Sequence, residues 1–68
     1  MRHRELTRKL RNLGCGLYRQ GKGSHEVWRN TNGDETTIPN WGSKDLPIGT
    51  IRKILRDLGI TREAFNEA

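Results

Sequence analysis

The segment Lys22-Gly23-Ser24-His25 contains the residue types best suited to chemistry in this chain of 68 residues. Histidine is the residue type whose unperturbed pKa lies closest to neutral pH, so it can both accept and donate a proton. Gly21 and Gly23 allow backbone amides to turn outward and approach a phosphate closely. Lys22 adds a positive charge and Ser24 a hydroxyl group. The pattern favours proton transfer at a phosphate, and it is also typical of a hairpin turn that ends in an exposed histidine.

Basic residues around this segment indicate a polyanionic partner. Thirteen Lys and Arg against eight Asp and Glu give a net charge of +5. The commonest polyanion for so small a basic protein is nucleic acid. Arg19 and Arg29 flank the histidine segment and are candidates to neutralise phosphates, or are solvated strand charges. Lys44 begins a run into a predicted helix, whose positive N-terminal end would also attract a phosphate.

Three aromatic residues, Tyr18, Trp28 and Trp41, are candidates for stacking on nucleotide bases. Aromatic side chains beside a basic groove commonly hold single-stranded RNA. The alternative for Trp28 is packing on a sheet, and for Trp41 it is an anchor that pins its loop to the core. The second histidine, His3, precedes the first predicted helix, where the chain is expected to fray. We therefore interpret His3 as a surface residue.

The cysteine content and the acidic residues argue against disulfide and metal chemistry. Cys15 is the only cysteine, so no internal disulfide forms and no zinc site of the usual kind is available. The acidic residues are scattered without metal-ligand spacing, so the sequence predicts no metal and no cofactor. No apolar run approaches the length of a membrane span. We expect a soluble, cytoplasmic protein with no membrane contact.

The sequence predicts two helices and three strands in the order α-β-β-β-α. The predicted elements span residues 4–13, 15–20, 25–30, 35–38 and 47–58. Neither helix can bury its apolar stripe alone, so we expect both to lie on one face of a three-stranded antiparallel sheet. A last short turn capped by Thr61 would carry Phe65 back toward the core. The expected fold class is α+β, in a single domain over residues 1–68, with the other sheet face open.

Apolar spacing identifies the expected core. The buried stripe of the second helix is expected to contain Ile48, Ile51, Ile54, Leu55 and Leu58. In the first strand, Cys15 and Leu17 share one side. Strand alternation places His25 on the same side as Val27. A histidine facing the core would be of no use, so we predict that His25 lies at the edge of the sheet, where the helix layer ends.

Four stretches of the chain together carry a resemblance to a known family. They are Leu10-Arg11-Asn12-Leu13-Gly14, Gly23-Ser24-His25, Ile38-Pro39-Asn40, and the run DLPIGTIRKILRDLGI over residues 45–60 followed by Phe65. The last stretch is the specific one, whereas a lone Gly-Ser-His would be a weak signal. In order and spacing, the four stretches resemble the HicA (YcfA-type) toxins of HicAB toxin–antitoxin pairs.

The resemblance implies a double-stranded-RNA-binding-domain-like α-β-β-β-α fold, which agrees with the order of elements predicted from the residues. It also implies cleavage of messenger RNA (mRNA), with the histidine of Gly-Ser-His, here His25, as the catalytic residue. The RNA-binding residues that we place around it are Arg19, Lys22, Gly23, Ser24, Arg29, Trp41 and Lys44. The implied protein partner is a HicB-type antitoxin that covers this site.

For the chemistry we predict a metal-independent endoribonuclease, in which a ribose 2′-OH attacks the adjacent phosphate. The nucleophile is already in place, so only proton transfer and charge stabilisation are needed. His25 would act as general base, or as acid toward the leaving 5′-oxygen. One histidine cannot hold both roles in a single concerted step. Lys22, Tyr18 and water are the candidates for the second role.

Two positions depart from the family pattern. Many members have a second histidine directly after the first, where this chain has Glu26, and many have a histidine after the Pro-Asn pair, where it has Trp41. A tryptophan cannot carry a proton between about pH 5 and 8, so activity would be weakened if that loop histidine assists catalysis in relatives. The alternatives to a nuclease are a non-catalytic RNA-binding module of the same fold and a degenerate toxin that acts only by binding its antitoxin.

Overall fold

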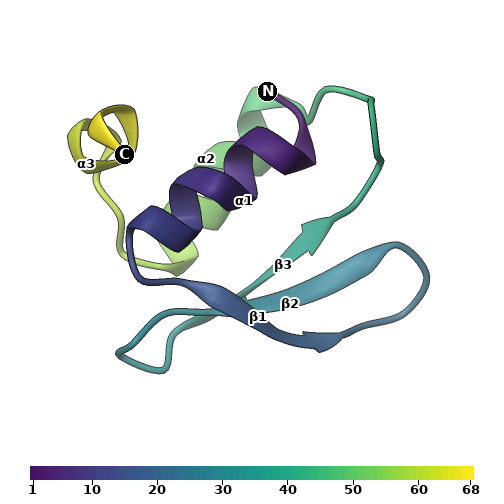
Figure 1. Ribbon diagram of the computed structural model, residues 1–68, viewed down its shortest axis with the longest axis horizontal. Coiled ribbons are helices and arrows are strands. Elements are labelled where there is room, and N and C mark those ends of the chain that lie inside the picture. The colour runs from purple at the N-terminus through teal and green to yellow at the C-terminus, as the bar shows by residue number, and fades with distance from the viewer.

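The computed structural model describes residues 1–68 and contains six helices and strands (Figure 1). In chain order they are α1 (His3–Asn12), β1 (Gly16–Gln20), β2 (His25–Arg29), β3 (Glu35–Pro39), α2 (Ile48–Asp57) and α3 (Arg62–Glu67). The predicted order and the α+β class are confirmed, and each main element begins and ends within about one residue of its predicted bounds. None of the helices is long and apolar enough to span a lipid bilayer.

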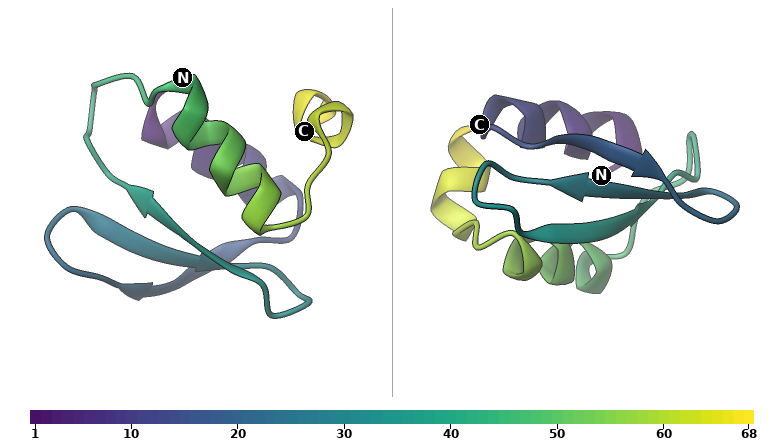
Figure 2. Two further views of the ribbon diagram at one scale, coloured as in Figure 1. Left: turned by 180° about the vertical axis from the view of Figure 1, so that it is seen from behind. Right: turned by 90° about the horizontal axis from the view of Figure 1, so that it is seen from below.

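The three strands form one antiparallel sheet in the order β1-β2-β3, and α1 and α2 lie side by side on one of its faces (Figures 1 and 2). Successive side chains of a strand point to opposite faces. In β2, Trp28 belongs to the core and Glu26 contacts His3 of α1, so both face the helices. His25 and Val27 therefore face the other way, where His25 is exposed and Val27 is 9% exposed. We call the face that carries His25 the open face of the sheet.

The core lies between the sheet and the helices. Its buried members are Leu6, Leu10, Cys15, Trp28, Ile38, Leu46, Ile54, Leu55, Leu58 and Phe65. Trp28 is the largest of them and only 1% exposed. Of the two interpretations of this tryptophan, packing on the sheet is therefore the correct one, and it takes no part in stacking on bases. The Arg11 guanidinium lies 5.0 Å from the centre of its ring.

The predicted C-terminal turn is the short helix α3. The Thr61 hydroxyl accepts a hydrogen bond from the Ala64 backbone N–H (3.1 Å), which caps the helix as expected. Phe65 is 5% exposed and packs into the core. Lys9 of α1 donates to the Phe65 carbonyl oxygen (3.1 Å), which ties α3 to the rest of the helix layer.

One expected core residue lies outside the core. Ile48 is 67% exposed, because the first turn of α2 stands at the open rim of a shallow hollow between α2 and α3. Leu17, predicted to share one side of its strand with Cys15, is 52% exposed. It lies opposite Trp28 on the helix side of the sheet, yet β1 is an edge strand whose residues are all exposed. Leu17 therefore lies on the helix side of the sheet but is not buried.

Candidate active site

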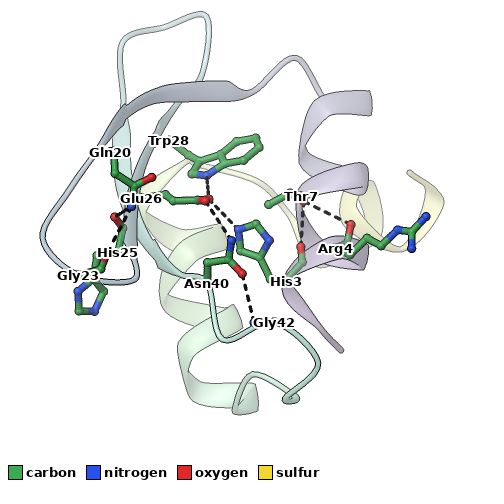
Figure 3. A network of polar contacts seen from close by, with 10 residues as sticks. All are labelled: His3, Arg4, Thr7, Gln20, Gly23, His25, Glu26, Trp28, Asn40 and Gly42. Atoms are coloured by element: carbon green, nitrogen blue, oxygen red, sulfur yellow. Dashed lines mark hydrogen bonds and ion pairs between the residues drawn. The ribbon is translucent and has the colours of Figure 1, made fainter.

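His25 is exposed at the start of β2, on the open face of the sheet. We predicted that His25 lies at the edge of the sheet, but it is the first residue of the central strand β2 and is exposed for a different reason. Val27 shares the side of His25, and that side faces away from the helices, so the histidine needs no edge position to reach solvent. In Figure 3 the His25 ring points away from the side chains that gather around Glu26.

The turn before His25 offers backbone donors to a ligand. The Gly21 N–H is not one of them, because it donates to the His25 carbonyl oxygen (2.9 Å). The N–H groups of Lys22, Gly23 and Ser24 make no hydrogen bond to another protein group. Gly23 has a φ of 57°, a left-handed conformation that favours glycine. Three consecutive free amides beside the Lys22 charge are suited to an anion.

Hydrogen bonds across the hairpin connect this turn to the neighbouring strands. The Gln20 side-chain amide donates to the carbonyl oxygens of His25 (2.9 Å) and Gly23 (3.3 Å). The His25 N–H donates to the Lys22 carbonyl oxygen (3.0 Å), which closes the turn. A side chain at position 21 would place its Cβ 3.2 Å from the His25 carbonyl oxygen, a tight contact that glycine avoids.

The two arginines predicted to bind phosphate occupy different parts of the open face. Arg19 is exposed and lies opposite Val27, one side-chain repeat along the face from His25. Arg29 is four residues from His25, about 13 Å along the strand. Its guanidinium stacks on Tyr18, with 3.7 Å to the ring centre, and contacts Glu35 at 3.4 Å. Arg19 is therefore the free cation beside the histidine, and Arg29 is held by neighbours.

The loop after β3 brings Trp41 and Lys44 together. Both line one open hollow, and the Lys44 N–H donates to the Trp41 carbonyl oxygen (3.3 Å). Trp41 is 44% exposed, so its ring is accessible and does not serve as a core anchor. The Asn40 N–H donates to the Ser24 carbonyl oxygen (2.7 Å), which fastens the start of this loop to the histidine turn. The predicted site residues at positions 22–25, 41 and 44 thus belong to two connected segments.

Sequence reasoning missed a network of polar side chains on the helix side of the sheet (Figure 3). Glu26 Oε1 accepts hydrogen bonds from His3 Nε2 (2.7 Å) and Trp28 Nε1 (2.9 Å), and Glu26 Oε2 accepts one from Asn40 Nδ2 (3.3 Å). We call these four residues the Glu26 network. His3 was expected to be a fraying surface residue, but its side chain is only 14% exposed, because Glu26 points into the helix layer and binds it.

A signal for this network was present in the sequence. Alternation along β2 puts Glu26 on the same side as Trp28, so a buried tryptophan implies a buried carboxylate. A buried carboxylate needs hydrogen-bond donors or a cation. The chain has only one other histidine, His3, and it starts the helix that covers this face.

The environment of Glu26 stabilises its charged form. Burial raises the pKa of Glu26, but the hydrogen bonds from Trp28, His3 and Asn40, together with the charge of His3, lower it. The lowering effects prevail, and the pKa lies below its ordinary value of 4.5. Glu26 is thus a carboxylate at neutral pH, engaged with its partners and turned away from the open face. It is not available as a proton donor beside His25.

The lowered pKa predicts how Glu26 contributes to stability as pH changes. A carboxyl with a lower pKa in the folded state stabilises the fold above its unfolded-state pKa, and this contribution is lost as pH falls through the folded-state pKa. The free energy of unfolding of wild type should exceed that of Glu26→Gln most above the ordinary glutamate pKa of 4.5, and the difference should shrink as the pH falls below that value. Urea unfolding measured at each pH tests this, with Glu67→Gln on the surface as the matched control. A difference that grows on acidification would contradict it.

The remaining candidate nucleophile, Cys15, is buried in the core. Cys15 is 6% exposed, and burial raises the pKa of its thiol, so it packs as an apolar side chain. No group of three or more His, Cys, Asp or Glu side chains comes together in a way that would hold a metal ion.

Comparison with protein families identifies the family of the chain. The model of the family described as "HicA toxin of bacterial toxin-antitoxin" matches residues 3–60. The chain belongs to the HicA toxin family. The match covers the histidine turn, the Glu26 network and the loop with Trp41, whereas α3 lies outside it. No curated protein matches the chain. Membership identifies a toxin of a toxin–antitoxin system, and such a system implies an antitoxin as its protein partner.

Proposed function

We propose that this HicA-family toxin is an endoribonuclease that cleaves mRNA without a metal ion and uses His25 as its catalytic residue. The observation that carries the proposal is the place of His25, exposed on the open face with the free Arg19 cation one side-chain repeat away. The net charge of +5 favours a polyanionic substrate. Membership of a toxin family agrees with an activity that harms the cell.

The proposed reaction needs only groups that RNA and this turn supply. The ribose 2′-oxygen forms a bond to phosphorus, the bond from phosphorus to the 5′-oxygen breaks, and the products are a 2′,3′-cyclic phosphate and a 5′-hydroxyl. His25 takes the 2′-OH proton or donates one to the leaving 5′-oxygen. Lys22 and the free amides of Gly23 and Ser24 stabilise the added negative charge on the phosphate.

The two histidines do not form an acid–base pair. His3 lies on the helix side of the sheet, bound to Glu26 at 2.7 Å, whereas His25 lies on the open face (Figure 3). The second proton-transfer group is therefore one that reaches the open face. Lys22 and water fit this role. Tyr18 is 52% exposed but stacked under the Arg29 guanidinium, which makes it the weaker candidate.

The remaining RNA contacts follow from the exposed residues of the two connected segments. Arg19 and Lys44 neutralise phosphates, Trp41 stacks on a base, and Arg29 contributes after exchanging its Glu35 contact for a phosphate. The proposed antitoxin is of the HicB type and covers this same surface. Because an antitoxin must block the toxin, binding of RNA and of antitoxin should exclude one another.

The chemistry of the products tests the function. Purified protein should cleave a single-stranded mRNA fragment in EDTA and leave 2′,3′-cyclic phosphate ends. A matched fragment with 2′-deoxy sugars should bind but stay intact, because it lacks the nucleophile. End-group analysis by mass spectrometry checks both. RNA that is bound and never cut would favour the non-catalytic RNA-binding module, and cleavage of the 2′-deoxy fragment would overturn the proposed reaction.

A further inference from the structure

Glu26 stands at a junction of three parts of the fold. It belongs to β2 and directly follows His25 in the chain. Its carboxylate receives hydrogen bonds from His3 at the start of α1, from Trp28 in β2 and from Asn40 in the loop after β3. The residue itself is 9% exposed, so these bonds are shielded from water. Without donors, a carboxylate in this place would destabilise the fold.

The loop that begins at Asn40 has few other attachments near its start. Asn40 uses its side-chain amide nitrogen for Glu26 (3.3 Å), its side-chain oxygen for the Gly42 N–H (3.2 Å) and its backbone N–H for the Ser24 carbonyl oxygen (2.7 Å). One asparagine thus connects Glu26, the histidine turn and the backbone on both sides of Trp41. The Trp41 side chain is 44% exposed, so burial in the core does not fix its place.

We propose that Glu26 is a positioning residue, which acts through Asn40 to hold the Trp41 loop beside the histidine turn. The inference depends on the proposed ribonuclease function, because it assigns the loop to substrate binding. Glu26 does not touch the RNA and transfers no proton. Its charge is held on the helix side of the sheet so that Asn40 keeps one orientation, with its amide nitrogen toward Glu26 and its oxygen toward Gly42. RNA then meets a preformed arrangement of Trp41, Lys44 and the free amides.

The proposal is tested by exchanging the hydrogen-bond donor and acceptor between positions 26 and 40. In Glu26→Gln, the amide nitrogen of the new side chain faces the amide nitrogen of Asn40, and the bond between them is lost. In Asn40→Asp, two carboxylates face each other and repel. In the double variant, a glutamine at position 26 donates to an aspartate at position 40, which still accepts from Gly42. The connection is restored with donor and acceptor reversed.

Separate measurements of KM and kcat distinguish a positioning role of Glu26 from a loss of folded protein. Each single variant should raise KM for a single-stranded RNA on the order of tenfold, the scale of a stacking contact that must be reordered on binding. The kcat should change less than about threefold, because His25 is untouched. The double variant should return KM to within about threefold of wild type. Glu67→Gln, on the exposed side of α3, is the matched control.

Hydrogen exchange gives a readout that does not depend on activity. The amides of Asn40 and Gly42 should exchange about tenfold faster in Glu26→Gln than in wild type and recover in the double variant, while amides of the β2–β3 ladder stay unchanged. A kcat that falls with KM constant, or a double variant no better than either single one, would overturn the positioning role. If no variant including wild type cleaves RNA, the proposed function fails, and the exchange rates alone still decide whether Glu26 orders the loop.

Discussion

Replacing His25 with alanine is expected to lower the rate of RNA cleavage by about 10²- to 10⁴-fold, the range over which general acid–base catalysis acts. The loss should be large because His25 is the only histidine on the open face, and His3 is bound to Glu26 on the helix side. Induced expression of wild type should therefore arrest growth and degrade RNA, whereas expression of His25→Ala should do neither.

The fold should survive this substitution. His25 is exposed, and the hydrogen bonds that close its turn are made by its backbone N–H and carbonyl groups, which alanine retains. The circular dichroism spectrum and the urea midpoint of His25→Ala should match those of wild type. Its affinity for RNA should fall only slightly, because Arg19, Lys22 and Trp41 are intact. Equal toxicity of the two proteins would remove His25 from the mechanism.

Truncating Trp28 to alanine is expected to have the largest effect on stability. Removing a buried tryptophan costs about 3–5 kcal/mol, and a chain of this length has a total stability of roughly 3–10 kcal/mol. Trp28 is 1% exposed, and its indole N–H also donates to Glu26 (2.9 Å), so the variant loses a core side chain and a donor to a buried carboxylate. The urea midpoint of Trp28→Ala should therefore fall far below that of wild type.

Two other tryptophan variants show whether the loss of stability comes from removing the buried Trp28 ring. Trp28→Phe keeps much of the buried volume and loses mainly the donor, so it should unfold cooperatively at a lower urea midpoint than wild type. Trp41→Ala removes a side chain that is 44% exposed and should shift the free energy of unfolding by about 0.5 kcal/mol or less. Circular dichroism during urea titration follows all three without relying on tryptophan emission. A Trp28→Ala midpoint close to that of wild type would contradict the place assigned to this ring.

The sequence predicted the fold well because its signals are local. The apolar spacing of α2 and the Thr61 cap of α3 are each set by neighbours in the chain, and each appears in the structure. Exposure depends on what covers a residue from elsewhere in the fold. Ile48 and Leu17 carry the correct side-chain direction but stand where the helix layer leaves them exposed.

The candidate site was predicted only in part, because the sequence indicates local segments and not contacts between distant residues. The turn with His25 is a continuous segment, so its residue types alone indicated its chemistry. The Glu26 network joins residues 3, 26, 28 and 40, which only the packing of α1 on the sheet brings together. Assigning Trp28 to the buried side of β2 would have placed Glu26 there as well and so indicated the network. That choice depended on Trp28, for which a place on the surface and a place in the core were both left open.

Comparing the cleavage rates of His25→Ala and His3→Ala tests most directly the claim that His25 is the catalytic residue. With protein in excess over RNA and EDTA present, single-turnover cleavage reports the chemical step separately from binding and product release. The rate constant of His25→Ala should fall by about 10²- to 10⁴-fold, while that of His3→Ala should stay within about tenfold of wild type, because its ring lies on the other side of the sheet. A larger loss in His3→Ala than in His25→Ala would contradict the account.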